Sequence, residues 1–381
     1  MDQQLIRQCV GIDISKESFT ACVCSYYRSG EEQLTEVVEF KNQKTGFNQL
    51  VKWSRKITSA SVPVGFVMEA TGVYYEALAY HLHRLNQPVS VLLPNKVKYF
   101  AKSWNVKTKT DIIDARIIAR MGAERKLSLW EPPLPIFKQL RDLTRAYSEL
   151  MKEKTAFSNR LHALNSSYEP LALIVKSNKS IIKKLDEQLV RFKAEIEKVI
   201  YSESWLAEKV KKVLTIKGVG LMTVAVILAE TQGFEFVDNI RQLCSYAGYD
   251  VVQRESGTSV QGKTRISKKG NSWIRAALHF PALVASRHNE NLKNTYLRIN
   301  EKKPSKMIGA TALQRKILVL IYTLWKNDTV YDEAFEKKRK ADRSEVHKKT
   351  LRQNKTKAGR SINNLPAQDE LEAKDLLSSL V

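Results

Sequence analysis

The first hundred residues alternate between two hydrophobic patterns, one with the period of a strand and one with the period of a helix. Apolar runs at Cys9–Ile14, Ser18–Ser25 and Leu34–Phe40 predict three strands. The segments between them are too short for crossover helices, so we expect an antiparallel meander. Helical spacing then alternates with two further strand-type runs, Val62–Met68 and Val89–Leu93.

This order of elements predicts an α/β N-terminal domain with a ribonuclease-H-like sheet. A doubly wound nucleotide-binding fold is the alternative, but no glycine-rich phosphate-binding loop follows the first predicted strand. The Pro-rich segment Glu131–Pro135 is the expected boundary of this domain.

Helical spacing dominates the rest of the chain. From Phe137 to Tyr201 the pattern is long and charged, and Tyr168–Pro170 interrupts it, so we expect a helical hairpin or a coiled coil. A largely helical domain follows, broken by the turn-rich segment Val251–Ile266. The predicted plan is an N-terminal domain at 1–130, a connector at 131–204, a C-terminal domain at 205–330 and a basic, disordered tail at 331–381.

Charge narrows the possible partners. The 381 residues carry a formal net charge of +23. Such an excess is typical of proteins that bind polyanions, because Lys and Arg release counterions when they neutralise phosphates. Nucleic acid is therefore the expected partner, with a basic ribosomal-type or membrane-surface protein as the alternative.

The cysteines and the apolar runs indicate the compartment. The four cysteines form no CxxC pair, and no histidine cluster completes a zinc site. Cys22 and Cys24 alternate on a predicted strand and are expected to be core residues. Free thiols without a signal peptide predict a cytoplasmic protein, and no apolar run reaches the length of a membrane helix.

Four acidic residues are the candidate catalytic groups. Asp13 and Glu69 end predicted strands, while Asp111 and Asp114 share one face at the start of a predicted helix. Four convergent carboxylates repel one another unless divalent cations neutralise them, so the cluster predicts Mg²⁺ and metal-assisted phosphodiester cleavage. Individually, each has a structural alternative: a turn residue, a helix cap for Asp111, or an ion pair within its own helix for Asp114.

The motifs around these acids resemble the DEDD transposases of bacterial insertion sequences, the family numbered one hundred and ten, which includes pilin-gene invertases. The matching motifs are Val10-Gly11-Ile12-Asp13-Ile14-Ser15-Lys16, Glu69-Ala70-Thr71-Gly72, Lys109-Thr110-Asp111 with Asp114-Ala115, Ile216-Lys217-Gly218-Val219-Gly220, Ser256-Gly257, Gly262, Ile266-Ser267-Lys268-Lys269-Gly270-Asn271 and Arg275. The resemblance covers nearly the whole chain up to about residue 330. It implies a Holliday-junction-resolvase-like (RuvC-like) nuclease domain with Mg²⁺ on the four acids. It also implies Ser256 as a nucleophile and a structured guide RNA that pairs with donor and target DNA.

The C-terminal motifs also have a local chemical interpretation. The Gly-rich turn with Gly218 and Gly220, followed by an apolar helix, resembles a helix-hairpin-helix that presents amides to a phosphate; an ordinary helix-packing turn is the alternative. Gly257 predicts a turn that exposes the Ser256 hydroxyl. Ser259, Ser267 and Ser272 are structural alternatives to Ser256. The cations expected to contact nucleic acid are Lys107, Lys109, Arg254, Lys263, Arg265, Lys268, Lys269 and Arg275.

Three functions fit these observations. The leading one is a recombinase that cuts and rejoins DNA as a dimer or tetramer, with the two sites meeting between subunits. A hydrolytic Holliday-junction-type endonuclease would use the acids and water alone. A nucleic-acid-binding protein without catalysis would need neither the acids nor Ser256.

Overall fold

The structure is a computed structural model in which the chain forms two compact units, with the boundary in the sequence between Pro132 and Pro133. Each unit is described by itself below. The structure describes residues 4–335 except Thr71, Lys109, Arg254, Thr258, Lys263, Lys302 and Pro304. Residues 336–381 of the predicted tail therefore lie outside the described residues.

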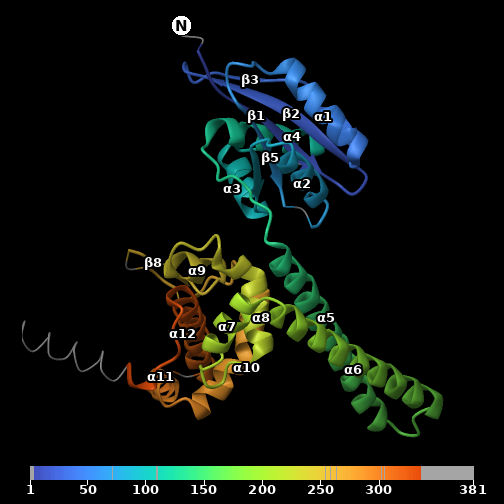
Figure 1. The fold of residues 1–381 in the computed structure, drawn as a ribbon, viewed down its shortest axis with the longest axis vertical. Helices are drawn as coiled ribbons and strands as arrows, with labels where there is room; N and C mark the ends of the chain where they lie inside the picture. Colours follow the sequence, from blue (N-terminus) through green and yellow to red (C-terminus); the bar gives the residue numbers. More distant parts are fainter. Residues whose placement is uncertain are drawn as a thin grey trace, which may run out of the picture. The chain divides into compact units, whose positions relative to one another are not determined.

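The N-terminal unit is built on one mixed sheet (Figure 1). Its strands are β1 (Leu5–Ile14), β2 (Ser18–Tyr27), β3 (Glu32–Leu34), β4 (Val38–Lys41), β5 (Val64–Glu69) and β6 (Val89–Leu92). The order is β3-β2-β1-β5-β6, with β4 also beside β2. The pairings of β2 with β1, β3 and β4 are antiparallel, which confirms the predicted meander, whereas β5 runs parallel to both β1 and β6.

The predicted third strand is two short strands, because Thr35 interrupts the ladder between them. The Val23 amide donates to the Thr35 side-chain oxygen at 3.0 Å, and the Thr35 amide donates to the Val23 carbonyl at 3.0 Å. A side-chain acceptor at this point replaces a backbone acceptor and divides the strand into β3 and β4. The sequence pattern carried no sign of this local hydrogen bond.

Helices cover both faces of the sheet. These are α1 (Lys44–Ile57), α2 (Glu76–Arg84), α3 (Pro94–Ser103) and α4 (Asp111–Glu124). Alternate residues of a strand point to opposite faces. Val10 and Ile12 of β1 belong to a buried cluster with residues of α1 and α2, whereas Cys9 belongs to a second cluster with residues of α3 and α4. Cys22 and Cys24 are buried in this second cluster, as predicted.

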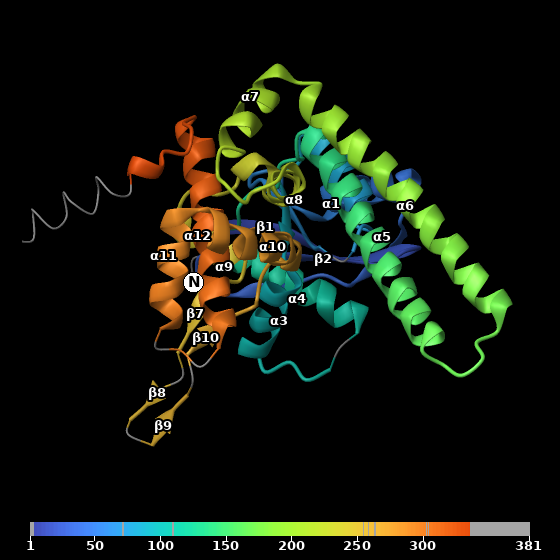
Figure 2. The same ribbon diagram turned by 90° about the horizontal axis from the view of Figure 1, so that it is seen from below.

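The C-terminal unit is mainly helical. It comprises α5 (Pro135–Asn165), α6 (Ala172–Tyr201), α7 (Ser204–Val213), α8 (Leu221–Thr231), a 3₁₀ turn (Gln232–Phe234), α9 (Ile240–Tyr246), α10 (Ser272–His288), α11 (Glu290–Asn300) and α12 (Lys306–Asn327). Helices α5 and α6 lie side by side and project from the rest of this unit (Figures 1 and 2), so the predicted long helical segment is a helical hairpin. Lys154 of α5 and Asp186 of α6 form an ion pair at 2.5 Å across it.

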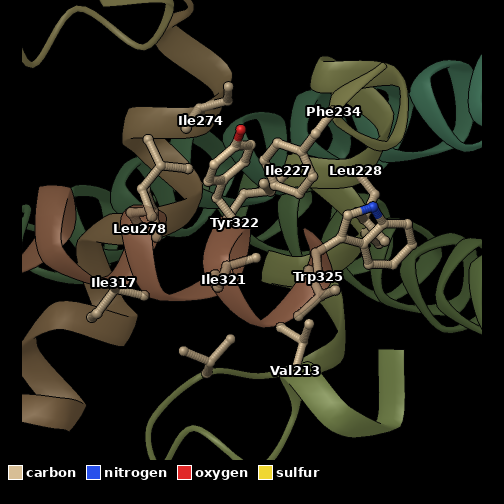
Figure 3. Close-up of a cluster of buried hydrophobic side chains, with 14 of the residues drawn as sticks. Val213, Ile227, Leu228, Phe234, Ile274, Leu278, Ile317, Ile321, Tyr322 and Trp325 are labelled. Carbon is tan, nitrogen blue, oxygen red and sulfur yellow. The ribbon is translucent and has the colours of Figure 1, made fainter. Parts of the chain in front are cut away.

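The core of this unit contains residues from the base of α5. Phe137 and Leu140 are buried together with the apolar side chains of α7, α8, α10 and α12, part of which Figure 3 shows. The beginning of the predicted connector is therefore a component of the C-terminal core.

Helix α12 is longer than the apolar run seen in the sequence. Among the described helices it is the one long and apolar enough, by length and composition, to cross a membrane, yet half of its most apolar window is buried in the protein. Ile317, Ile321 and Trp325 lie in the core, which accounts for its apolar character (Figure 3).

Candidate catalytic and nucleic-acid-binding sites

Asp13 and Glu69 lie at the same end of neighbouring parallel strands. Ile12 of β1 pairs with Met68 of β5, so the two acids occupy the next position of that register. Gly11 on β1 and Val67 on β5 face α4. Asp13 and Glu69 each lie two residues further along the same strands. Since side-chain direction repeats every two residues, Asp13 and Glu69 share the α4 face. Both are partly buried.

Helix α4 approaches this face unusually closely. A Cβ atom built on Gly11 would lie 2.0 Å from the Ala119 backbone nitrogen and 2.5 Å from the Ala115 carbonyl oxygen. One built on Gly122 would lie 2.1 Å from the Cys9 sulfur. Moving along β1 from Cys9 to Gly11 thus means moving back along α4, which brings the start of α4 to the end of β1 where Asp13 lies.

Asp111 and Asp114 occupy the first turn of α4. Thr110 is the N-cap, and its side chain accepts from the Ile113 amide at 3.3 Å. The alternative of Asp111 as the helix cap is therefore wrong. Thr20, which pairs with Asp13 across β1 and β2, donates its hydroxyl to the Asp111 carbonyl at 3.2 Å. This bond ties the first residue of α4 to the sheet beside Asp13.

The four acids thus lie at one end of one face of the sheet, but they do not form a ready-made metal cage. Among the residues that the structure describes, no three Asp, Glu, His or Cys side chains lie close enough together to hold a metal ion. Their convergence on a metal stays a prediction. The carboxylate oxygens are of the kind that Mg²⁺ takes, and Mg²⁺ commonly uses one or two protein carboxylates together with substrate phosphates.

Lys107 lies in the loop that leads into α4 and is exposed, three residues from the Thr110 cap. Lys109 lies outside the described residues. The exposed Lys96 and Lys98 of α3 precede this loop. In the sequence, these lysines thus lie close to Asp111 and Asp114, at the acidic end of the sheet.

Ser256 stands on a narrow β-ribbon that the sequence did not predict. The strands are β7 (Val251–Val252), β8 (Glu255–Ser256), β9 (Val260–Gln261) and β10 (Arg265–Ile266). β7 pairs with β10 at the base, and β8 pairs with β9 further out (Figure 2). Ser256 is exposed, and Gly257 at the turn has a φ of +54°, which confirms the predicted turn and the exposed position of Ser256.

The predicted cations around Ser256 have different surroundings. Arg265, Lys268 and Lys269 are exposed on the returning side of the ribbon. Arg275 is partly buried and donates from Nη1 to the Ala247 carbonyl at 2.7 Å and to the Asn271 carbonyl at 3.2 Å, so it holds the backbone at the base. Arg254 and Lys263 lie outside the described residues.

The Gly-rich turn between α7 and α8 serves packing at one glycine and leaves the other open. Gly218 has a φ of +97°, and a Cβ on it would lie 2.8 Å from the Ala285 backbone nitrogen of α10. Gly220 is exposed, and a Cβ on it would meet nothing within 4 Å. Gly220 is also the N-cap of α8 and supplies no side-chain cap, so the first amides of α8 lack such a partner.

A buried polar network was missed by sequence reasoning. The Glu230 side chain of α8 is only 2% exposed and receives Arg145 Nε at 2.7 Å, Arg145 Nη2 at 2.9 Å and Asn271 Nδ2 at 2.6 Å. The Tyr246 hydroxyl donates to the Glu230 carbonyl at 2.9 Å. The two hydrogen bonds that Arg145 donates to Glu230 raise the pKa of Arg145 above its usual value.

This network positions the base of the ribbon. Asn271 also caps α10 by accepting from the Trp273 amide at 2.9 Å and the Ile274 amide at 3.1 Å. Asn271, two residues after Lys269, therefore links the start of α10 to Glu230 of α8 and Tyr246 of α9, and through Glu230 to Arg145 of α5. A glutamate inside an apolar helix such as Leu221–Thr231 was the one available signal, because a buried carboxylate requires a partner.

Comparisons with known proteins identify transposases in both units. The family model described as "Transposase", of the DEDD type, matches residues 10–170. The model described as "Transposase IS116/IS110/IS902 family" matches residues 210–297. The class is thus that of DEDD transposases. The chain belongs to the IS110 family of these transposases, which are enzymes that cut and rejoin DNA.

Curated relatives match along most of their length. The pilin gene-inverting protein of Moraxella bovis is 26% identical over 326 residues, which cover 85% of this chain and 97% of that protein. The transposase for insertion sequence element IS1111A of Coxiella burnetii is 25% identical over 358 residues, covering 84% of this chain and 90% of that protein. A crystal structure of an Aquifex aeolicus Ppx/GppA family protein aligns at 12% identity with a TM-score of 0.20, which is too low to carry an argument about the fold.

Proposed function

We propose that this transposase recombines DNA with two chemically distinct sites: a Mg²⁺ site on Asp13, Glu69, Asp111 and Asp114, and Ser256 as the nucleophile. The observation that carries the proposal is the common position of the four acids at one end of the sheet, set by the close packing of α4 on Gly11. The strand order, with three antiparallel strands followed by parallel β5 and β6, supports a ribonuclease-H-like (RuvC-like) unit.

Asp13 and Glu69, on adjacent strands, would hold the metal together with Asp111 and Asp114 of the first turn of α4. Phosphate oxygens of the DNA would complete its ligand set, as is usual for Mg²⁺. When bound, the metal supplies Lewis-acid stabilisation of the charge that develops during phosphodiester cleavage. Lys107 and Lys109 neutralise neighbouring phosphates and hold the strand in place.

Ser256 conserves the phosphodiester energy. Its Oγ loses a proton and forms a bond to phosphorus while the bond from phosphorus to a deoxyribose oxygen breaks, and that oxygen takes a proton. In rejoining, a deoxyribose hydroxyl attacks the phosphoserine and Ser256 regains its proton. No external energy source is needed, because each bond broken is matched by an equivalent bond formed.

The cations of the ribbon and the turn hold the DNA. Arg265, Lys268 and Lys269 are exposed beside Ser256, and Arg254 and Lys263 belong to the same segment of the sequence. Such cations stabilise charge on a reacting phosphate. The uncapped first amides of α8 at Gly220 provide a phosphate contact of the helix-hairpin-helix kind, and Gly218 shapes the turn.

We extend the proposal to partners by family resemblance. Donor and target DNA are the substrates, a structured guide RNA pairs with both, and a dimer or tetramer brings the acids of one subunit to Ser256 of another. The net charge of +23 supports large nucleic-acid partners. The α5–α6 hairpin, with exposed Leu171 and Leu173 at its turn, supports a subunit contact.

Replacing Ser256 by alanine tests the proposal against hydrolysis. Ser256→Ala should abolish strand exchange and the covalent protein–DNA product, whereas a hydrolytic endonuclease would cut at the normal rate. Ser259→Ala, on the same exposed turn, is the matched control and should keep activity.

Mixing Asp13→Ala with Ser256→Ala subunits should restore part of the activity. Normal recombination in excess EDTA would contradict the metal assignment.

A further inference from the structure

A groove of about 980 Å³ runs along the outer side of α12 in the C-terminal unit. Its walls come from α12, the start of α9, the end of α11 and the segment after α12. The apolar residues that line it include Ile240, Ile299, Val319, Leu320, Val330 and Phe335. Ile240, Val330 and Phe335 are 42%, 57% and 59% exposed, so the groove presents apolar surface that the described chain does not cover.

The chain leaves the described residues at the rim of this groove. Lys212 pairs with Asp328 at 2.6 Å and Lys217 pairs with Glu333 at 2.8 Å. The Tyr331 amide donates to the Thr215 hydroxyl at 2.8 Å. These bonds fasten the segment after α12 to α7 and to the turn that follows it, so the exit point at Phe335, itself a lining residue, is fixed.

Beyond Phe335 the charge of the sequence changes from positive to negative. Residues 336–360 are rich in Lys and Arg, whereas residues 369–381 carry four acids and one lysine. The acids are Asp369, Glu370, Glu372 and Asp375. The same residues contain two apolar series with steps of three or four, namely Ala373, Leu376 and Leu380, and Ala373, Leu377 and Val381, the spacing that puts side chains on one side of a helix.

We propose that residues 369–381 bind the groove of their own chain. The leucines supply the apolar surface that the groove lacks, and the acids complement Arg315 and Lys316 on its wall. Arg315 is exposed, and Lys316 lies within 3.4 Å of the Thr295 hydroxyl. The intervening chain spans roughly 110 Å when extended, which is ample for an intramolecular contact. Because the segment is covalently connected to the rim of the groove, its effective concentration there exceeds that of the same segment from a second copy of the chain.

Disulfide trapping in the full chain tests the contact. The four native thiols are buried. Burial also raises the pKa of Cys24 to about 12, so introduced thiols should react first. Thr323→Cys lines the groove, and Ser378→Cys lies among the leucines of the segment. We expect oxidation to join this pair within one chain, at a rate independent of protein concentration.

The matched control pairs Ser378→Cys with Ser167→Cys, which is exposed at the turn between α5 and α6. The groove pair should form its disulfide at least about tenfold faster than this control, as effective concentration predicts. Leu376→Asp with Leu377→Asp should reduce the groove pair to the control rate. Equal rates for the two pairs, or a product found only between chains, would overturn the proposal.

A charge reversal tests the electrostatic part. Arg315→Glu should slow formation of the groove disulfide by several-fold, and added salt should slow the parent pair in the same direction. Arg298→Glu, exposed on α11 and not among the lining residues, is the control and should have no effect. An unchanged rate in Arg315→Glu would overturn the pairing of acids with Arg315.

Discussion

Asp13 lies near the end of β1, a strand of the sheet that carries the core of the N-terminal unit. Ser256 lies on a ribbon whose strands are two residues long. The position of Asp13 is held by several contacts at once, because β1 pairs with a strand on each side and α4 packs against the backbone of β1 at Gly11. The position of Ser256 depends on a short ladder beside Gly257 and on the polar network at its base. Under the proposed function, the carboxylates would thus be held by a rigid sheet, while the nucleophile would be carried to a large substrate by an exposed ribbon.

The difference implies that mutations around the acids act through the fold, whereas mutations on the ribbon act through the substrate. Core packing is dense and tolerates little added volume, so substitutions near the acids should change stability and activity together. Substitutions on the ribbon should change activity alone, because exposed positions contribute little to folding.

Gly11→Ala should have the largest effect on stability. The new methyl group would meet the Ala119 backbone at 2.0 Å, so α4 must move off the sheet. We expect the free energy of unfolding of the N-terminal unit to fall by about 3 kcal/mol, the upper range for overpacking. Denaturant-dependent hydrogen exchange of β1 and α4 measures it. Gly65→Ala on neighbouring β5, where a Cβ meets nothing within 4 Å, is the control. Equal stabilities of the two variants would refute the close packing.

Glu230→Ala should have the second largest effect. It leaves Arg145 and Asn271 without their shared acceptor. Arg145 is 42% exposed and can turn to water, so we expect a loss of about 2 kcal/mol in the C-terminal unit, less than for a fully buried pair. Exposed Glu235→Ala should be neutral. Hydrogen exchange of α8 and α10 distinguishes them, and protection equal to the parent protein would argue against the network as a stabilising element.

A smaller effect should appear as a pH dependence of the N-terminal unit. Burial raises the pKa of Cys24 from 9.0 to about 12, and the pKa values of Cys9 and Cys22 are raised for the same reason. In the unfolded chain these thiols ionise near 9, so the unfolded state binds fewer protons above that pH. The unit should therefore lose stability as pH rises from about 9 toward 12.

Comparing unfolding at about pH 8 and about pH 10 isolates this contribution when the parent chain is set against Cys24→Ala. The parent should lose more stability between the two conditions than the variant. An identical loss in both proteins would show that this thiol does not carry the dependence.

Ser256→Ala should have the smallest effect on stability, within about 0.5 kcal/mol, because the residue is exposed. Its thermal midpoint should match that of the parent even though strand exchange is lost. A large drop in the midpoint would mean that Ser256 stabilises the turn of the ribbon and has a structural role.

The sequence alone determined most elements of the N-terminal sheet and both helices of the hairpin. Their apolar periods are strong because each element buries one face, so β2, β5 and β6 begin and end within two residues of the predicted strands, while β1 ends as predicted but begins four residues earlier, at Leu5. Local chemistry also predicted the exposed turn at Gly257. What failed were features set by single hydrogen bonds or very short pairings, namely the break at Thr35 and the ribbon that carries Ser256.

Only the tertiary structure decided how distant residues meet. The common end reached by Asp13, Glu69 and α4 follows from strand register and from a helix that packs against a glycine, and neither has a signature along the chain. The same holds for Glu230, whose partners lie 85 and 41 residues away in sequence. Periodicity reports which face of an element is buried, whereas the partner that buries it is selected by three-dimensional packing.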